Sequence, residues 1–388
     1  MRFGILTTHP IQYQVPLFKR LAETPGVDFT AYFCCDHGLR PSFDPGFGKT
    51  IQFDVPLTEG YGHRFLRNVA PNPGVRTSGM LNPSVGIETR DLDVLVITGY
   101  AHTATWLRTF WPRLGQRKPR LLFRGENHLN EARPAWKTLA KQAPIRAFFS
   151  RFDRFLAIGT LNRDYLMHYG APENRIVIAP YSVDNDYFRE RSMVRSREEV
   201  RSAHGIPLDR VAFLTCSKLS DVKRPLDAVR AFAKARKEAP CSLVMVGTGI
   251  LEQPIRAEIS RLGLEKDVFL LGFQNQSELP SIYAACDALV LPSDIEPWGL
   301  VVNEAMACGI PAVVSDRVGS GPDLVAGTGE IFPVGDVNRL AAIMTKYAKV
   351  PKELAQAKTR ARSRIGEWGI AETASAYLDA ARAALRDT

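Results

Sequence analysis

The sequence contains few cysteines and no long uninterrupted apolar segment. Six cysteines occur among 388 residues, and none of them forms a Cys-x-x-Cys pair. We therefore expect buried free thiols in a reducing cytosol rather than a disulfide framework or a structural zinc site. No stretch of eighteen uncharged apolar residues is present, so no membrane-spanning helix is expected. The first seven residues lack a signal-peptide cleavage pattern and are expected to form a first strand.

The sequence also lacks internal repeats and low-complexity tracts. Its length of 388 residues suggests two or three domains, and 45% hydrophobic with 23% charged residues is ordinary for a globular protein. The net charge of +9 is uneven: residues 1–185 contain 23 Lys and Arg against 15 Asp and Glu, whereas residues 186–388 contain 27 against 26. A basic first half suits an anionic membrane surface or lipid phosphate. No nucleic-acid recognition motif is found, so nucleic acid is not an expected partner.

Short apolar segments alternate with helical patterns along the whole chain. Continuous apolar runs of four to six residues are typical of parallel strands that are covered on both faces. The alternation predicts an α/β fold with parallel sheets, and the series occurs twice, with a boundary near 180–195. The expected strands are 2–7, 92–98, 121–124, 155–158 and 175–179 in the first half, and 211–217, 242–247, 268–273, 288–292 and 312–315 in the second. The expected helices include 225–239, 278–285 and 370–385.

The segment 291–311 contains the strongest turn and helix signals. A strand is expected to end near Ser293, Pro297 suits the first turn of a helix, and Gly309 suits its C-terminal end. The helix therefore begins close to Gly299. Its free backbone N–H groups then lie at the carboxyl ends of the strands, where open α/β sheets bind ligands and where a helix N-terminus attracts phosphate.

Two glutamates flank the expected start of this helix. Glu296 lies in the loop before the helix, and Glu304 lies one and a half turns into it, within reach of a hydroxylated ligand. Gly299 permits close approach of the backbone because it has no side chain. The alternative is a chance pair of glutamates on a surface helix, which the surrounding turn residues make a poorer explanation.

This segment resembles the Glu-x7-Glu signature of the retaining glycosyltransferases of family 4. Glu296 and Glu304 match the two glutamates, and the four residues from Pro297 to Leu300 match a family pattern in which Phe usually stands in place of Trp298. The resemblance implies that Glu296 is a catalytic residue that contacts the donor sugar and that Glu304 binds the nucleotide ribose. It also implies that the backbone N–H groups at Gly299 and Leu300 hold the distal phosphate.

The same resemblance implies a domain organisation and an activity. The fold would be GT-B, with two Rossmann-like domains facing a cleft: an acceptor domain at 1–185, a nucleotide-sugar domain at 186–369, and a helix at 370–388 that crosses back to the first domain. The reaction would be retaining transfer of a sugar from a UDP- or GDP-linked donor to a glycan or lipid-linked acceptor. We expect the process to be assembly of a cell-surface polysaccharide or lipid-linked glycan.

Two lysines follow the first expected strand of the second half. Lys218 and Lys223 can converge on one diphosphate and stabilise the charge on a departing nucleotide, although solvated loop lysines are the alternative. The family usually has Arg and then Lys here, and lysine lacks the bidentate fork of arginine. The resemblance also makes Gly247, in a glycine turn, and Phe273, in a stretch that borders the base in relatives, expected nucleotide-binding residues.

Three strings resemble other motifs and are discounted. Residues 46–50 look like the end of a P-loop, but Phe43 stands where its first glycine would be. The Asp-x-Asp strings at 91–93 and 184–186 lead into a strand and lie in the linker, respectively. Because lysines supply the cations, no metal and no further cofactor are expected to be required.

The first half offers polar residues near expected strand ends. Arg124, Glu126 and His128 lie where relatives often carry a histidine, with Glu126 nearest to that position, and are expected to assist catalysis. His9 follows the first strand, where such enzymes usually place a glycine-rich loop, and is expected to border the nucleotide sugar. His102 is a weaker candidate. Each histidine could equally cap or pack against a strand end.

Residues 108–154 form a basic stretch with 12 Lys and Arg against 3 Asp and Glu. Aromatic residues interleave with the cations, so the stretch could rest on the anionic inner face of a membrane, where lipid-linked acceptors are found. We therefore expect a cytoplasmic protein with a peripheral membrane surface as one partner. Pro144 is expected to interrupt any single helix here. The alternative is a core of aromatic residues with a solvated basic face.

Three other functions remain compatible with the sequence. A sugar-nucleotide epimerase or a phosphorylase of the same architecture would show no transfer to an acceptor. A non-catalytic protein that keeps the nucleotide site would bind the donor without turning it over. A nucleic-acid binder would use the basic half, and would be revealed by filter binding at moderate salt.

Overall fold

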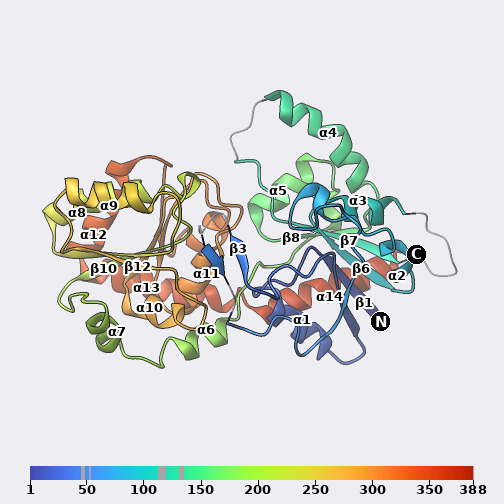
Figure 1. The fold of residues 1–388 in the computed structure, drawn as a ribbon, viewed down its shortest axis with the longest axis horizontal. Coiled ribbons are helices and arrows are strands. Elements are labelled where there is room, and N and C mark those ends of the chain that lie inside the picture. The colour runs from blue at the N-terminus through green and yellow to red at the C-terminus, as the bar shows by residue number, and fades with distance from the viewer. Residues whose placement is uncertain (45–48, 52–53, 112–118, 131–134, 388) are drawn as a thin grey trace. The chain divides into compact units, whose positions relative to one another are not determined.

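The computed structural model describes residues 1–44, 49–51, 54–111, 119–130 and 135–387. The chain divides into two compact units (Figure 1). The first unit contains Met1–Ser42, Val55–Tyr181 and Ile370–Thr388, and the second contains Phe43–Asp54 and Ser182–Gly369. Within the described part of the chain, no helix is long and apolar enough to cross a membrane.

The first unit is built on a seven-stranded sheet. Its strands have the order β5-β2-β1-β6-β7-β8-β9, and each neighbouring pair is parallel. The strands are β1 (Arg2–Thr7), β2 (Asp28–Phe33), β5 (Gly62–Phe65), β6 (Val94–Thr98), β7 (Arg120–Gly125), β8 (Arg154–Ala157) and β9 (Ile176–Ile178). The helices are α1 (Val15–Ala22), α2 (Val85–Glu88), α3 (Thr103–Phe110), α4 (Ala135–Phe149), α5 (Thr160–His168) and α14 (Ile370–Arg386), with short 3-10 turns at Thr77–Gly79 and Glu173–Arg175.

Alternate residues of the central strands enter two different cores. Val94 and Val96 of β6 pack in the core beneath α1 and α14, whereas Leu95 and Ile97 pack with the aromatic residues of the opposite face. Both faces are therefore covered, which explains why the strands are continuous apolar runs. The C-terminal helix α14 packs on α1, β7 and β8 (Figure 1), and its Thr373 hydroxyl donates to the Pro180 carbonyl at 2.7 Å.

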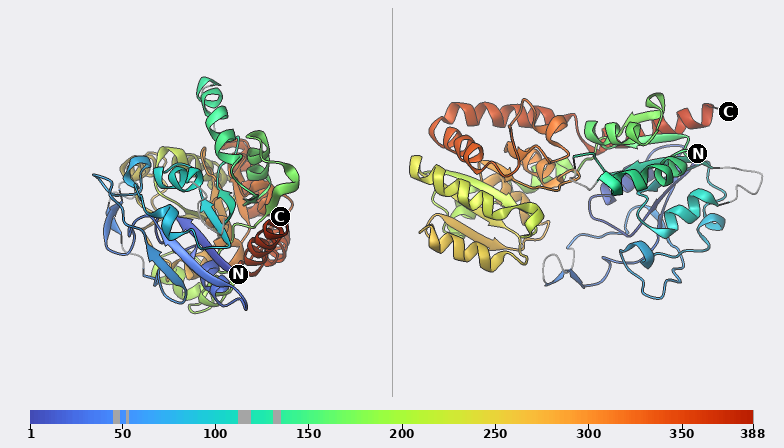
Figure 2. Two further views of the ribbon diagram at one scale, coloured as in Figure 1. Left: turned by 90° about the vertical axis from the view of Figure 1, so that its right-hand side faces the viewer. Right: turned by 90° about the horizontal axis from the view of Figure 1, so that it is seen from above.

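The helix α4 corrects one expectation. It runs without interruption through Pro144 and extends outward from the rest of the first unit in both figures (Figure 2). Proline removes the hydrogen bond to the carbonyl four residues earlier, here that of Ala140. Ala140 and Pro144 are both exposed, so water can satisfy that carbonyl and the helix continues.

The second unit has a six-stranded parallel sheet in the order β12-β11-β10-β13-β14-β15. The helices α8, α9 and α12 pack on one face of this sheet and form a hydrophobic core with it (Figure 1). The helices α10, α11 and α13 belong to the same unit. The strands are β10 (Val211–Cys216), β11 (Cys241–Val246), β12 (Val268–Gly272), β13 (Ala288–Leu291), β14 (Ala312–Ser315) and β15 (Glu330–Phe332). The helices are α6 (Asn185–Arg191), α7 (Arg197–Ala203), α8 (Pro225–Glu238), α9 (Glu252–Arg261), α10 (Leu279–Ala285), α11 (Leu300–Ala307), α12 (Val337–Lys349) and α13 (Pro351–Gly366), with short turns at Asp221–Lys223 and Gly321–Val325. A separate two-stranded sheet joins β3 (Ser42–Asp44) and β4 (Lys49–Ile51).

The α/β prediction with parallel sheets is confirmed, and the expected strands correspond to observed ones within a few residues. Three strands of the two main sheets were not predicted: β2, the exposed strand β5 and the three-residue strand β15. All six cysteines are free and buried, as expected. Residues 46–48 of the discounted P-loop string lie outside the described residues.

Candidate functional site

The loop between β13 and α11 forms the centre of the candidate site in the second unit. Gly299 immediately precedes α11 with a left-handed φ of 89°, and Gly309 ends it with φ 85°. A Cβ atom at position 299 would lie 3.1 Å from both the Glu296 Cγ and a Leu291 methyl group. Glycine is therefore favoured by the left-handed conformation, and a side chain would in addition crowd these two neighbours by a few tenths of an ångström. The predicted helix start is confirmed, and its free N–H groups lie at the carboxyl end of the sheet.

A second glycine turn packs against this loop and fixes its path. The Gly319 N–H donates to the Glu296 carbonyl at 2.9 Å, and the Ser320 N–H donates to the Trp298 carbonyl at 3.0 Å. A Cβ atom at Gly319 would lie 1.9 Å from the Pro297 carbonyl oxygen, so this contact excludes any larger residue. The backbone that carries Glu296 is thus held on one side by the segment after β14.

The segment after β10 holds the other side of the loop. The Asp294 N–H donates to the Val222 carbonyl at 2.8 Å. The Lys223 ammonium contacts the Glu296 carboxylate, and the two side chains are 20% and 12% exposed. Two residues that the sequence suggested separately are therefore brought together at one edge of the sheet. Lys218 lies on the same segment, five positions earlier, and is half-buried.

The backbone at Arg224, next to Lys223, adopts an unusual conformation. Its φ is 49°, and among the described residues no other non-glycine residue has a positive φ. Its guanidinium pairs with Asp227 at 2.6 Å, which helps to hold the turn that begins α8. A left-handed residue that carries a side chain is strained and persists where surrounding contacts hold it. The strain lies at the residue that follows the candidate phosphate-binding lysine.

Glu304 lies inside the unit and is held by a residue that the sequence analysis did not single out. Glu304 is 1% exposed, and the Tyr283 hydroxyl donates to its Oε2 at 2.6 Å. Burial, together with Cys216 and Glu304, raises the pKa of Tyr283 well above its ordinary value. Burial and the nearby Glu304 raise the pKa of the Cys216 thiol to about 12. Tyr283 therefore remains a neutral donor that orients the carboxylate.

The remaining nucleotide-binding candidates lie on neighbouring turns of the same edge. Gly247 has φ 129°, and a Cβ atom there would lie 1.9 Å from the Ser217 carbonyl oxygen. Its N–H donates to the Gly272 carbonyl at 2.7 Å, which joins the ends of β11 and β12 beside Phe273. Leu300 is the first residue of α11.

Trp298, where the family pattern has Phe, has two specific contacts. Its indole N–H donates to the Asn303 side-chain oxygen at 2.9 Å, and its ring stacks on Trp368 with centroids 5.9 Å apart. Trp298 is 3% exposed. It therefore links the Gly299 loop to the end of α13 rather than presenting its ring to solvent.

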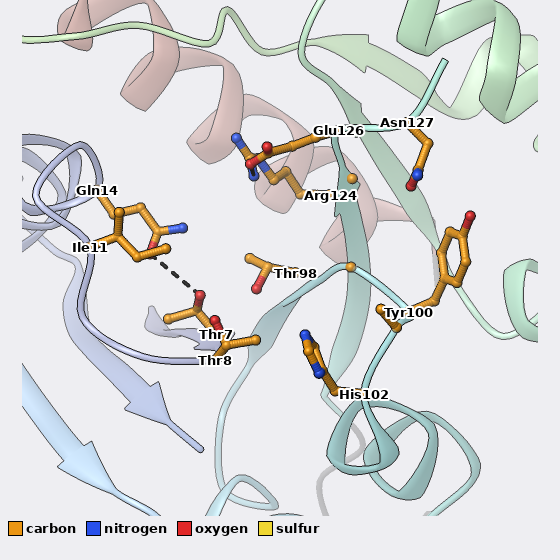
Figure 3. A pocket seen from close by; sticks show the side chains of 13 residues that line it. Thr7, Thr8, Ile11, Gln14, Thr98, Tyr100, His102, Arg124, Glu126 and Asn127 are labelled. Atoms are coloured by element: carbon orange, nitrogen blue, oxygen red, sulfur yellow. Dashed lines mark hydrogen bonds and ion pairs between the residues drawn. The ribbon is translucent and has the colours of Figure 1, made fainter. Parts of the chain in front are cut away.

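The first unit contains a cavity of about 240 Å³ at the carboxyl ends of β1, β6 and β7 (Figure 3). Polar side chains from these three strand ends line it, including Thr7, Thr98, His102, Arg124 and Glu126 (Figure 3). Because the strands are parallel, their ends meet at one edge of the sheet, the position where ligands bind in such sheets.

Arg124 and Glu126 form an ion pair in the wall of this cavity. Arg124 is 7% exposed, and its guanidinium lies over the Tyr181 ring, 4.3 Å from the centroid. Burial alone would lower the pKa of Arg124, but Glu126 and Tyr181 outweigh it and raise the pKa. Arg124 therefore keeps its charge, and the carboxyl oxygens of Glu126, the more exposed partner, can accept hydrogen bonds from a ligand.

The histidine candidates differ in their surroundings. Burial, His37 and His102 lower the pKa of His9 to about 4, and the His9 and His37 ring centroids lie 5.2 Å apart. His102 lines the cavity. His128 is 4% exposed, and its Nδ1 accepts the Asn130 N–H at 3.2 Å, which corresponds to the packing and capping alternative.

Neither Asp-x-Asp string forms a metal-binding arrangement. Asp93 accepts the Arg2 N–H at 2.7 Å, and Asp184 caps α6 by accepting the Tyr187 N–H at 3.0 Å. Among the described residues, no group of three or more His, Cys, Asp or Glu side chains is placed to hold a metal ion.

Residues 196–364 match the family described as glycosyl transferases group 1. The N-acetyl-alpha-D-glucosaminyl L-malate synthase of Bacillus anthracis is 33% identical over 161 residues, which cover 41% of this chain and 40% of that protein. The D-inositol 3-phosphate glycosyltransferase of Kineococcus radiotolerans is 29% identical over 276 residues, which cover 66% and 61%. The chain thus spans about half the length of the curated relatives it matches.

Solved structures match over the full chain at low identity. Anabaena Alr3699/HepE in complex with UDP and glucose has a TM-score of 0.72 and 17% identity, covering 99% of this chain and 100% of that one. Sucrose-phosphate synthase from Thermosynechococcus elongatus has a TM-score of 0.72 and 16% identity, covering 100% of each chain. The fold is therefore that of the GT-B glycosyltransferases. The match to the group 1 family concerns residues 196–364, which belong to the second unit.

Proposed function

We propose that this protein is a retaining glycosyltransferase of family 4 that moves a sugar from a nucleotide diphosphate sugar to an acceptor hydroxyl. The observation that carries the proposal is the contact between Lys223 and Glu296 beside the N-terminus of α11. A cation, a carboxylate and free backbone N–H groups meet at one sheet edge. Such a set can bind a diphosphate and a sugar at the same time.

The donor would lie on the second unit. Lys218, Lys223 and the N–H groups at Gly299 and Leu300 would hold the diphosphate, and their charge would stabilise the departing nucleoside diphosphate. Glu304 would bind the ribose, and Gly247 and Phe273 would border the nucleoside. Because lysines and backbone dipoles neutralise the leaving group, we propose that no metal is required.

The reaction would form one glycosidic bond and break one. The acceptor oxygen bonds to the anomeric carbon on the face from which the nucleotide leaves, while the bond between that carbon and the phosphate oxygen breaks. The acceptor proton passes to the departing phosphate oxygen. Glu296 would hold the sugar in this geometry, so the protein supplies positioning and charge rather than a strong base.

The acceptor would bind on the first unit, in the cavity at the ends of β1, β6 and β7. Glu126, which is held by Arg124, can accept a hydrogen bond from a hydroxyl group, and His102 offers a second polar contact. His9 lies next to Thr8, which lines the same cavity. His128 would support this wall indirectly, since its side chain is buried.

We further propose a glycan or lipid-linked acceptor at the surface of a membrane. The support is α4, which carries Trp136 at 67% exposure and the exposed cation Arg146 and extends outward from its unit (Figure 2). The aromatic residues Phe148, Phe149 and Phe152 are buried, however, and belong to the core alternative. Co-sedimentation with anionic and neutral vesicles, using Trp136→Ala, separates these two explanations.

The main test is thermal stabilisation by a panel of nucleotides and nucleotide sugars. One diphosphate nucleotide, UDP or GDP, should raise the melting temperature of the native chain, and the shift should disappear in Lys223→Ala and Glu304→Ala. Folded protein that responds to no nucleotide would exclude the proposal. Donor binding without transfer or hydrolysis would instead indicate a non-catalytic binding protein, and donor turnover without an acceptor product would indicate an epimerase or phosphorylase.

A further inference from the structure

A second cavity lies at the opposite end of α11 from the candidate donor site. Its volume is about 420 Å³, and its lining includes the last turn of α11 from Met306 to Gly309. One face of α6 and the end of α13 complete its walls. Because α11 is a single helix of eight residues, this cavity is separated from Gly299 by the length of that helix.

The charge of the lining is positive. Two arginines, Arg189 and Arg362, line the cavity, and no Asp or Glu does so. Arg189 pairs with Asp186, whereas Arg362 has no ion-pair partner within the described part of the chain. The guanidinium of Arg362 lies close to Gly309, where a Cβ atom would meet its Nε at 2.6 Å. The glycine thus makes room for this arginine at the cavity wall.

The rest of the lining is largely apolar and includes two methionines, whose side chains adapt their shape to a ligand. Met193, Met306 and Ile365 contribute thioether and aliphatic surface. Met193 is 70% exposed at the rim, which is unusual for so apolar a side chain. Methionine adapts to irregular apolar groups, so this surface suits a ligand with an apolar body.

The cavity wall is linked by hydrogen bonds and ring stacking to the loop that precedes α11. Asn185 lies three residues after the passage from the first unit to the second at Tyr181–Ser182. Its side-chain amide donates to the carbonyls of Ile365 and Trp368 at 2.9 and 3.4 Å. Trp368 in turn stacks on Trp298 in the loop that precedes α11. Two routes, α11 itself and the tryptophan stack, thus join the cavity wall to the candidate donor loop.

We propose that this cavity is a binding site for a small organic anion, separate from the donor and acceptor sites. A carboxylate or phosphate group binds Arg362 and Arg189, and an apolar body rests on Met193 and Met306. Arginine suits such groups because its planar guanidinium binds two oxygens at once. Binding at this site would shift α11 and thereby the Gly299 loop at its other end. Only this effect on the donor loop rests on the proposed function.

The binding test uses phenyl phosphate as the probe on the full chain, with inorganic phosphate and phenol as separate comparisons. Isothermal titration gives the stoichiometry and the affinity. Phenyl phosphate should bind at one site per chain and more tightly than either comparison compound. Arg362→Gln should weaken it about tenfold or more, because a charge-assisted hydrogen bond is lost.

Three variants make the result specific. Met193→Glu places a negative charge at the exposed rim and should also weaken binding, without removing any buried group. Arg191→Gln, on the same helix but outside the lining, should leave binding unchanged. Lys223→Ala should also leave it unchanged, and saturating UDP or GDP should not displace the probe.

Either of two outcomes would overturn the proposal. One is the absence of saturable binding to folded protein. The other is binding that survives Arg362→Gln and Met193→Glu but is lost in Lys223→Ala or displaced by nucleotide, which would place the probe in the donor site. That second outcome would support the proposed function while excluding the second site, so the two hypotheses fail separately.

Discussion

The ammonium group of Lys223 contacts the carboxylate of Glu296 across 73 positions of sequence. Each residue neutralises the other in the free protein, and both side chains are only partly exposed. A bound diphosphate would compete with Glu296 for the lysine and would release the carboxylate toward the sugar. Because the two residues carry opposite charges, their substitution should change the affinity for a diphosphate in different ways.

Substitution of Glu296 and of Lys223 should separate catalysis from binding. Lys223→Ala should weaken nucleoside diphosphate binding about tenfold or more, since a charge-assisted contact is lost. Glu296→Gln should leave that affinity equal or improved, because a negative charge leaves the phosphate site, yet lower the transfer rate about 10²- to 10³-fold. Calorimetry with the free nucleotide and an initial-rate transfer assay measure the two effects. Parallel loss of affinity in both variants would contradict separate roles.

Tyr283→Phe should weaken nucleotide binding although the tyrosine itself need not touch the nucleotide. The change keeps the ring that fills the core and removes the hydroxyl that orients Glu304. Loss of a hydrogen bond to a charged group corresponds to about 1.5–3 kcal/mol. We expect the effect with ribonucleotides and much less of it with a donor analogue that lacks the ribose hydroxyls.

Tyr347→Phe is the matched control for this substitution. Tyr347 is also buried, on α12, and belongs to the core on the other side of the sheet from Glu304. Its loss of a hydroxyl should leave nucleotide affinity unchanged. Equal weakening by both variants would mean that Tyr283 acts only through general stability.

The features that could be predicted from sequence are those that depend on local chemistry. The helix start at Gly299 follows from Pro297, from the glycine itself and from the stop at Gly309, all within one short segment. The buried strands were recognisable because both of their faces are apolar. By contrast, β5 is exposed along its whole length, so its residues carry no pattern of burial.

The features that could not be predicted depend on distant parts of the chain. Nothing local indicates that Tyr283 donates to Glu304, or that Lys223 meets Glu296, because each contact arises from the order of strands in the sheet. Pro144 was misjudged for a related reason. The cost of proline within a helix depends on whether water reaches the carbonyl it leaves unpaired, which the sequence does not state.

The stability of the first unit should fall as the pH decreases from about 6.5 to about 4. Burial and the neighbouring His37 and His102 lower the pKa of His9 from 6.5 to about 4. As the pH falls through this range, the unfolded chain binds a proton at His9 while the folded chain does not. The contribution of His9 to stability is therefore complete above about pH 6.5 and is lost as the pH falls toward 4. The difference in free energy of unfolding corresponds to roughly 3 kcal/mol. Thermal unfolding of the native chain and of His9→Gln should show a weaker pH dependence in the variant, and identical profiles would contradict this assignment.

The second unit should lose stability in a lower range, below about pH 4, through Asp287. Burial alone would raise the pKa of Asp287, but hydrogen bonds and ion pairs with Arg197 and Lys358, each at 2.8 Å, outweigh it and lower the pKa from 3.8 to about 2. The group is 5% exposed and also pairs with the fully buried Arg201 at 2.8 Å. The stability that Asp287 contributes is complete above its pKa in the unfolded chain and is lost as the pH falls through its pKa in the folded chain. This contribution is about 2 kcal/mol.

Asp287→Asn tests this assignment directly. The substitution removes the charge that compensates the buried Arg201 and should cost about 3–5 kcal/mol at neutral pH, because an unpaired buried charge remains. It should also abolish the loss of stability between pH 4 and pH 2 that the native unit shows. Asp379→Asn, on the exposed face of α14 with a partner at 3.3 Å, is the control and should change stability by less than about 1 kcal/mol. A destabilised variant that kept the acid dependence of the native chain would assign that dependence to another carboxylate.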